Sequence, residues 1–110
     1  MIDWNRVHEL RDEIGADEFA DVVDLFLEEV ESEISALRER DRPDRIEARL
    51  HFLKGSALNL GFEDFAALCQ TGERMASQGH ANKVDITEII EIYDQSRAAF
   101  IVGLRQSDDI

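Results

Sequence analysis

The sequence has a single cysteine and no long apolar run, which exclude an intramolecular disulfide and a membrane-spanning helix. Cys69 alone cannot form an intramolecular disulfide, which fits a reducing compartment. No apolar stretch approaches the roughly 20 residues that span a bilayer. The N-terminus also lacks the basic segment and apolar run of a signal peptide. We therefore expect a cytoplasmic protein without a membrane helix.

Basic residues are scarce as well. The 110 residues include 12 lysines and arginines against 25 aspartates and glutamates, which gives a net charge of -13 at pH 7. A surface of this sign repels nucleic acids and anionic membranes, because both carry dense negative charge. The expected partner is therefore another protein or a small ligand.

The sequence has only one proline, Pro43, and its β-branched residues never form a long alternating run. Apolar residues recur instead at spacings of three and four, which predicts helices. The length fits one domain over residues 1–110. Short connections between long helices imply antiparallel neighbours. We predict an all-α fold, an antiparallel up-down four-helix bundle with a short extra N-terminal helix, with helices at about 3–14, 17–40, 43–60, 63–78 and 86–105.

Each predicted helix carries one apolar stripe that should face the core. Residues 79–84 should form a polar loop, and residues 106–110 should fray. The expected core residues are Ile2, Val7, Leu10, Ile14, Phe19, Val23, Phe26, Val30, Ile34, Leu37, Ile46, Leu50, Leu53, Ala57, Leu60, Phe65, Leu68, Cys69, Gly72, Met75, Ile86, Ile89, Ile90, Tyr93, Phe100 and Leu104.

The third predicted helix places His51 opposite its apolar stripe. A rotation of about 100° per residue puts Lys54, Gly55 and Leu58 on the same outward face, with Gly55 about 40° from His51. A glycine inside a helix costs about 1 kcal/mol relative to alanine, so Gly55 needs a reason. Without a side chain one turn from the imidazole, another molecule could approach the ring closely.

Lys54 supplies the second requirement of a phosphate carrier, a cation beside the histidine. A phosphoryl group carries about two negative charges, and an ammonium stabilises it by charge-assisted hydrogen bonds. The face therefore predicts a reversible phosphate carrier. Each residue also has a plainer interpretation: His51 and Lys54 could belong to a solvated face, and Gly55 could allow close helix packing.

The segment His51-Phe-Leu-Lys-Gly-Ser-Ala-Leu-Asn-Leu-Gly61 resembles the H-x-L-K-G-(S/A)-(S/A)-x-x-x-G signature of histidine phosphotransfer (HPt) domains. Leu68-Cys69 also resembles the family, whereas Gly72 stands where a leucine is common. The resemblance implies that His51 accepts a phosphoryl group on Nε2 from a receiver-domain aspartate and passes it to another receiver aspartate. It further implies that Lys54 stabilises the phosphate, that Gly55 keeps access open and that Gly61 lets the chain turn into the next helix.

The implied partners are response-regulator receiver domains, with a hybrid histidine kinase as a further candidate. The receiver should supply Mg²⁺, so the chain should have no cofactor or metal of its own and no autonomous kinase activity. We expect a monomer, and the Met1 start favours a freestanding shuttle. Docking should use exposed apolar residues around His51, namely Leu58, Phe52, Ala48 and, from the second helix, Leu25.

Three alternatives stay open at this level. The bundle could bind receivers without transferring phosphate. Glu47 and His51 could belong to a di-metal bundle, although no second pair of this kind is present. His8 begins a segment that resembles the start of a histidine kinase H-box but lacks the proline that follows there, and we expect it to be an ordinary exposed residue, as we do His80.

Overall fold

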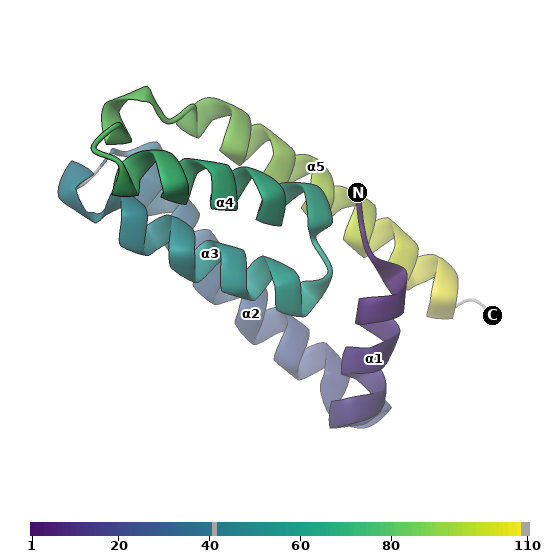
Figure 1. Cartoon of the computed structure of the whole chain (residues 1–110). Coiled ribbons are helices and arrows are strands. Elements are labelled where there is room, and N and C mark those ends of the chain that lie inside the picture. Colours follow the sequence, from purple (N-terminus) through teal and green to yellow (C-terminus); the bar gives the residue numbers. More distant parts are fainter. Residues whose placement is uncertain (41, 109–110) are drawn as a thin grey trace.

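The computed structural model describes residues 1–40 and 42–108, and every regular element of this part is a helix (Figure 1). The all-α prediction is therefore confirmed. Within the described residues, none of the helices is both long and apolar enough to cross a membrane. The helices are α1 (Trp4–Ile14), α2 (Ala16–Arg38), α3 (Ile46–Leu60), α4 (Glu63–Ser77) and α5 (Ile86–Asp108), with short 3-10 turns η1 (Pro43–Arg45) and η2 (Ala81–Lys83).

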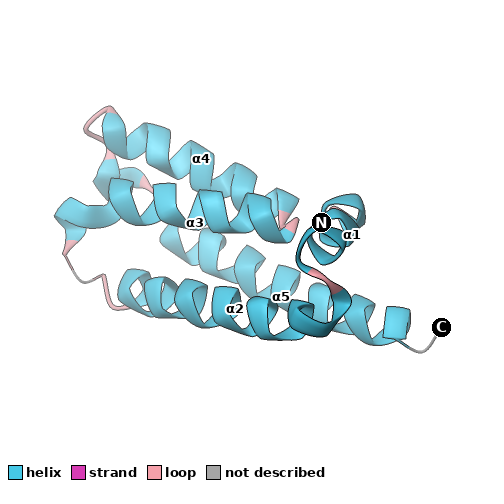
Figure 2. Cartoon of the chain, turned by 90° about the horizontal axis from the view of Figure 1, so that it is seen from below, coloured by secondary structure: helices cyan, strands magenta, loops and turns pink. Residues whose placement is uncertain are grey.

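The described chain is elongated, 47 × 21 × 20 Å, and four of its helices form a bundle. Each packs against its neighbours in the chain, and α5 also packs against α2, which closes the ring. The closest packing joins α3 to α4. The short helix α1 lies across one end of the bundle, as Figures 1 and 2 show from two directions. This is the predicted four-helix bundle with an extra N-terminal helix.

The predicted boundaries hold to within a few residues. The α-helical part of the third helix begins at Ile46, because Pro43–Arg45 form a 3-10 turn first. The second helix ends at Arg38, since Arg40 and Arg42 adopt positive φ angles of 54° and 53° that interrupt a helix. The prediction that residues from 106 onward fray is wrong up to residue 108, where α5 ends, and residues 109 and 110 lie outside the described part.

The core confirms most of the predicted stripes, with two corrections. In α2, Leu27 is buried at 8% exposure and Phe26 is only partly buried, because α2 faces α3 on one side and α5 on the other. The segment 79–84 is not wholly polar and open, since η2 turns Val84 inward to 7% exposure. The predicted core residues that are only partly buried are Ile2, Ile14, Phe26, Leu68, Met75, Ile90 and Leu104.

The N-terminus is fastened to the turn between α3 and α4. The Asp3 N–H donates to the Gly61 carbonyl at 2.7 Å, and Ile2 pairs with Phe62 in a short antiparallel bridge. Gly61 has a φ of +82°, which favours glycine, and a Cβ there would lie 2.7 Å from the Asp3 carbonyl oxygen. Gly61 thus serves the predicted turn and also admits the N-terminal segment.

Candidate functional site

The candidate site lies on the outer face of α3. The His51 side chain is 70% exposed, whereas Leu50 and Leu53 on either side of it in sequence are fully buried. The helix therefore presents His51 to solvent while its opposite face holds the core. This is the orientation that the helical wheel predicts.

Gly55 lies beside this histidine in open space. A Cβ built on Gly55 meets no atom within 4 Å outside its own helix segment. Close helix packing therefore does not account for the glycine, in contrast to Gly72, where a Cβ would come within 2.8 Å of the Leu50 side chain. Gly72 lets α4 approach α3, which explains why a leucine does not stand there. The free space next to His51 is what an incoming phosphorylated partner would need.

Glu73 of α4 contacts both His51 and Lys54, although the sequence spacing within α3 does not predict it. Its Oε1 atom lies 2.7 Å from His51 Nδ1, and its Oε2 atom lies 2.8 Å from the Lys54 ammonium. The Lys54 ammonium, and after it the His51 ring, hold the pKa of Glu73 below its usual value, although partial burial acts in the opposite direction. Glu73 is therefore ionised at neutral pH.

The Glu73 carboxylate decides which ring nitrogen of His51 carries the proton. An ionised carboxylate only accepts hydrogen bonds, so Nδ1 must be the donor across the 2.7 Å contact. In the neutral ring the lone pair then resides on Nε2, the nitrogen without a partner among the described residues. The geometry presents Nε2 as the free nucleophilic atom.

Lys54 is partly buried and already forms an ion pair, which the sequence does not indicate. Its side chain is 25% exposed and its ammonium is already paired with Glu73. An ammonium has three N–H donors, so a single carboxylate partner leaves others available. The ion pair holds the cation on the α4 side of His51.

Exposed apolar side chains surround this face. Leu58 is 58% exposed and Phe52 is 41% exposed, and Ala48 is exposed on the same helix. Leu25 is 57% exposed on α2, pointing away from the core. The Glu33–Arg49 ion pair, at 2.8 Å, joins α2 to α3. The four predicted docking residues are therefore all on the surface, three of them on the helix of His51.

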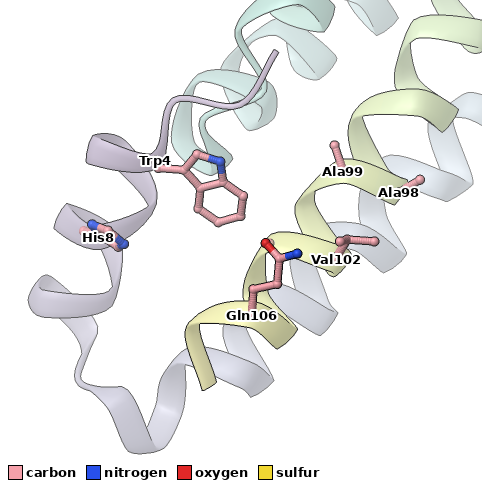
Figure 3. A pocket seen from close by; sticks show the side chains of 7 residues that line it. Trp4, His8, Ala98, Ala99, Val102 and Gln106 are labelled. Carbon is pink, nitrogen blue, oxygen red and sulfur yellow. The ribbon is translucent and has the colours of Figure 1, made fainter. Parts of the chain in front are cut away.

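The other two histidines lie elsewhere. His8 lines an open groove of about 600 Å³ between α1 and α5, together with Trp4 and Val102 (Figure 3). His80 is exposed just before η2. In the part of the chain that the structure describes, neither ring has a hydrogen bond or ion pair. Nothing in their surroundings resembles the arrangement at His51.

The described residues do not support the alternative of a di-metal site with Glu47 and His51. Among residues 1–40 and 42–108, no three histidine, cysteine or acidic side chains are grouped so that they could hold a metal ion. Glu47 is exposed one turn before His51 and has no hydrogen bond or ion pair with its ring. Cys69 is fully buried, and burial raises the pKa of its thiol to about 12, so it is a neutral core residue.

Comparison with known families agrees with this geometry. The family model of the Hpt domain matches residues 21–99, a range that contains α3, α4 and the whole His51–Gly61 segment. No curated protein and no solved structure gave a significant match. Hpt domains carry out histidine phosphotransfer in phosphorelays and interact with receiver domains. Because the match covers well over half of the chain, this protein belongs to the Hpt domain family.

Proposed function

We propose that His51 is the phosphate carrier of this Hpt domain, accepting a phosphoryl group from the aspartate of one receiver domain and passing it to the aspartate of another. The observation that carries the proposal is the hydrogen bond between His51 Nδ1 and Glu73, which leaves an exposed Nε2 beside the open space at Gly55. A carrier needs a nucleophile that is accessible, correctly protonated and held in one orientation.

The transfer follows from this arrangement. The Nε2 lone pair attacks the phosphorus in line, the bond from phosphorus to the aspartyl oxygen breaks, and the aspartate leaves as a carboxylate. The bundle contributes mainly position, because α3 and α4 fix the ring through Glu73. The Mg²⁺ that assists the reaction belongs to the receiver domain, as do most of the catalytic groups.

Lys54 is proposed to stabilise the phosphoryl group once it is attached. The ammonium can keep its ion pair with Glu73 and use a second N–H toward a phosphate oxygen, since a phosphoryl group of about two negative charges attracts it strongly. Removal of this charge should weaken phosphorylation without removing the nucleophile.

The receiver is proposed to dock on the exposed apolar residues Phe52, Leu58, Ala48 and Leu25. Phe52 and Leu58 lie within two turns of His51, so burying them brings the receiver aspartate near Nε2. Buried apolar area stabilises such a contact by roughly 25 cal/mol per Å² before the costs of association.

The test is incubation with a receiver domain carrying a labelled aspartyl phosphate. The wild-type protein should acquire an acid-labile, base-stable label, as phosphohistidine requires, and the His51→Gln variant should keep its helical circular dichroism and stay unlabelled. The His80→Gln variant is the matched control and should be labelled like the wild type. Binding of the phosphorylated receiver without any label would instead identify a pure interaction module.

A further inference from the structure

The end of the bundle opposite α1, where α2 ends and α5 begins, carries a groove with an apolar floor and a basic rim (Figures 1 and 2). We propose that this groove binds an acidic segment of a protein partner, with an apolar side chain of that segment held between α2 and α5. The inference goes beyond the proposed function, because none of the residues that line the groove belongs to the His51 site or to its docking residues.

Two adjoining hollows make up the groove. The larger, of about 530 Å³, is lined from η1, η2 and the first turns of α3 and α5, and the smaller, of about 200 Å³, lies between the end of α2 and the start of α5. Arg40 and Ile86 line both hollows, so the two form one continuous groove. Ile46 and Ile86 are buried beneath it, and Ile90 is partly buried. An apolar side chain laid on this floor would be removed from water, which favours binding.

The rim of the groove is basic although the whole chain carries a net charge of -13. Arg38 and Arg40 line the groove, and both side chains are exposed. Arg45 and Lys83 are exposed nearby, at the ends of η1 and η2, which contact each other. Within the described part of the chain, none of these four cations has an ion pair. Their charge is therefore available to an anionic partner.

Two acidic side chains also line the groove, but they do not cancel the charge of its rim. Asp44 in the larger hollow is already paired with Arg42 at 3.3 Å. Glu91 in the smaller hollow is exposed on α5 and has no ion pair among the described residues. The lining thus holds two unpaired cations, Arg38 and Arg40, against one unpaired anion.

Arg40 stands in a backbone conformation that other residues adopt more easily. Its φ angle is +54°, in the left-handed region that glycine and asparagine reach at a lower cost. Its N–H donates to the Leu37 carbonyl at 3.0 Å, which fixes the turn after α2. Because Arg40 lies past the last turn of α2, it does not offset the helix dipole as Arg38 does. A charged residue kept in this conformation, between two hollows, indicates a role for its side chain.

The combination of floor and rim favours an acidic protein segment over other anions. A small anion would leave the apolar floor in contact with water. A nucleic acid or an anionic membrane would extend beyond the groove onto a strongly acidic surface, which repels it. A short segment with carboxylates beside an apolar residue contacts this end alone and matches both features of the groove.

The experiment uses an array of short fluorescent peptides in which leucine, isoleucine, phenylalanine or tryptophan is flanked by glutamates. Binding of each peptide to the folded protein is measured by fluorescence anisotropy. The wild type is compared with Arg40→Glu and with Arg105→Glu as the matched control. Arg105 is an exposed cation without an ion pair among the described residues, and it lies in the last turn of α5, at the other end of the bundle.

The wild type should bind members of the array, and Arg105→Glu should bind the same members equally well. Arg40→Glu should bind them at least about tenfold more weakly, because a cation on the rim becomes an anion that faces the carboxylates. Peptides with glutamine in place of glutamate, or serine in place of the apolar residue, should lose at least about as much affinity. Binding of no peptide at up to about 1 mM protein, or equal binding by Arg40→Glu and the wild type, would overturn the inference.

A second measurement locates the bound peptide without any variant. Backbone NMR shifts of the wild-type protein should change most around Arg40, Ile86 and Ile90 when the peptide is added. Changes centred on His51, or on the groove between α1 and α5, would overturn the inference. The His51→Gln variant should bind the peptide like the wild type, so failure of the proposed phosphotransfer and failure of this inference are separate results.

Discussion

Replacement of Gly55 by alanine should make the protein more stable and less active. The methyl group would meet no atom within 4 Å outside its own helix segment, so it adds no strain. Gly55 lies in the interior of α3, where alanine is favoured over glycine by about 1 kcal/mol. In a domain of this size that gain corresponds to a rise in melting temperature of roughly 4 °C.

The same methyl group would stand one turn from His51, on the side from which a phosphorylated receiver must approach. Because misplacement of a reacting group by about 1 Å can cost up to about 100-fold in rate, we expect phosphotransfer to His51 to slow by at least about tenfold. Thermal unfolding followed by circular dichroism measures the first effect, and the initial rate of labelling by a phosphorylated receiver measures the second.

The two readouts refute different parts of the reasoning. A lower melting temperature would mean that Gly55 packs against something after all. A higher melting temperature with an unchanged rate of labelling would mean that Gly55 does not keep access to His51 open.

Three further predictions concern neighbouring residues. Gly72→Ala should lower the melting temperature, because a Cβ 2.8 Å from the buried Leu50 side chain overpacks the core by about 1–3 kcal/mol, which exceeds the gain in helix propensity; a rise would show that Leu50 moves aside freely. Leu58→Asp should weaken receiver binding at least about tenfold in a titration. Val102→Asp, a change at a similarly exposed residue on α5, should leave receiver binding unchanged. The unfolding free energy of both variants should lie within about 0.5 kcal/mol of the wild-type value. The pKa of the Glu73 carboxyl is lower in the folded protein than in the unfolded chain. The stability that this difference contributes is present above the unfolded value of about 4.3 and is lost as the pH falls through the folded value. Denaturant melts on the acid side should therefore show a steeper loss of unfolding free energy for the wild type than for Glu73→Gln.

The helices could be predicted because their signal is local. Apolar residues three and four apart define a helix and its buried side without knowledge of the neighbours, and Leu50, Leu53 and Ala57 are buried as that rule requires. Phe26 packs against the core as expected but is only partly buried, and the burial of Leu27 does not follow from the stripe, because it depends on how α2 is rotated between α3 and α5. Val84 was missed because a 3-10 turn, invisible in the periodicity, directs it inward.

In the site, too, the local features could be predicted from the sequence and the contacts between helices could not. His51, Lys54 and Gly55 share one helix, so their common face follows from sequence spacing alone. Glu73 lies 22 positions from His51, and its contacts depend on the register between α3 and α4. One signal was present: Glu73 follows the buried Cys69 by one turn, which places it at the edge of the α4 face that meets α3. Gly72 stood out as a departure from the family pattern, and the close approach of Leu50 gives the reason for it.

The most direct test of the central claim is the position of phosphorus on the phosphorylated protein. NMR coupling between phosphorus and the ring nitrogens of ¹⁵N-labelled histidine identifies both the residue and the atom that carry the phosphoryl group. The structure predicts coupling to Nε2 of His51, since Nδ1 is held by Glu73 at 2.7 Å. Phosphorus coupled to Nδ1 of His51, or to a nitrogen of His8 or His80, would contradict the account.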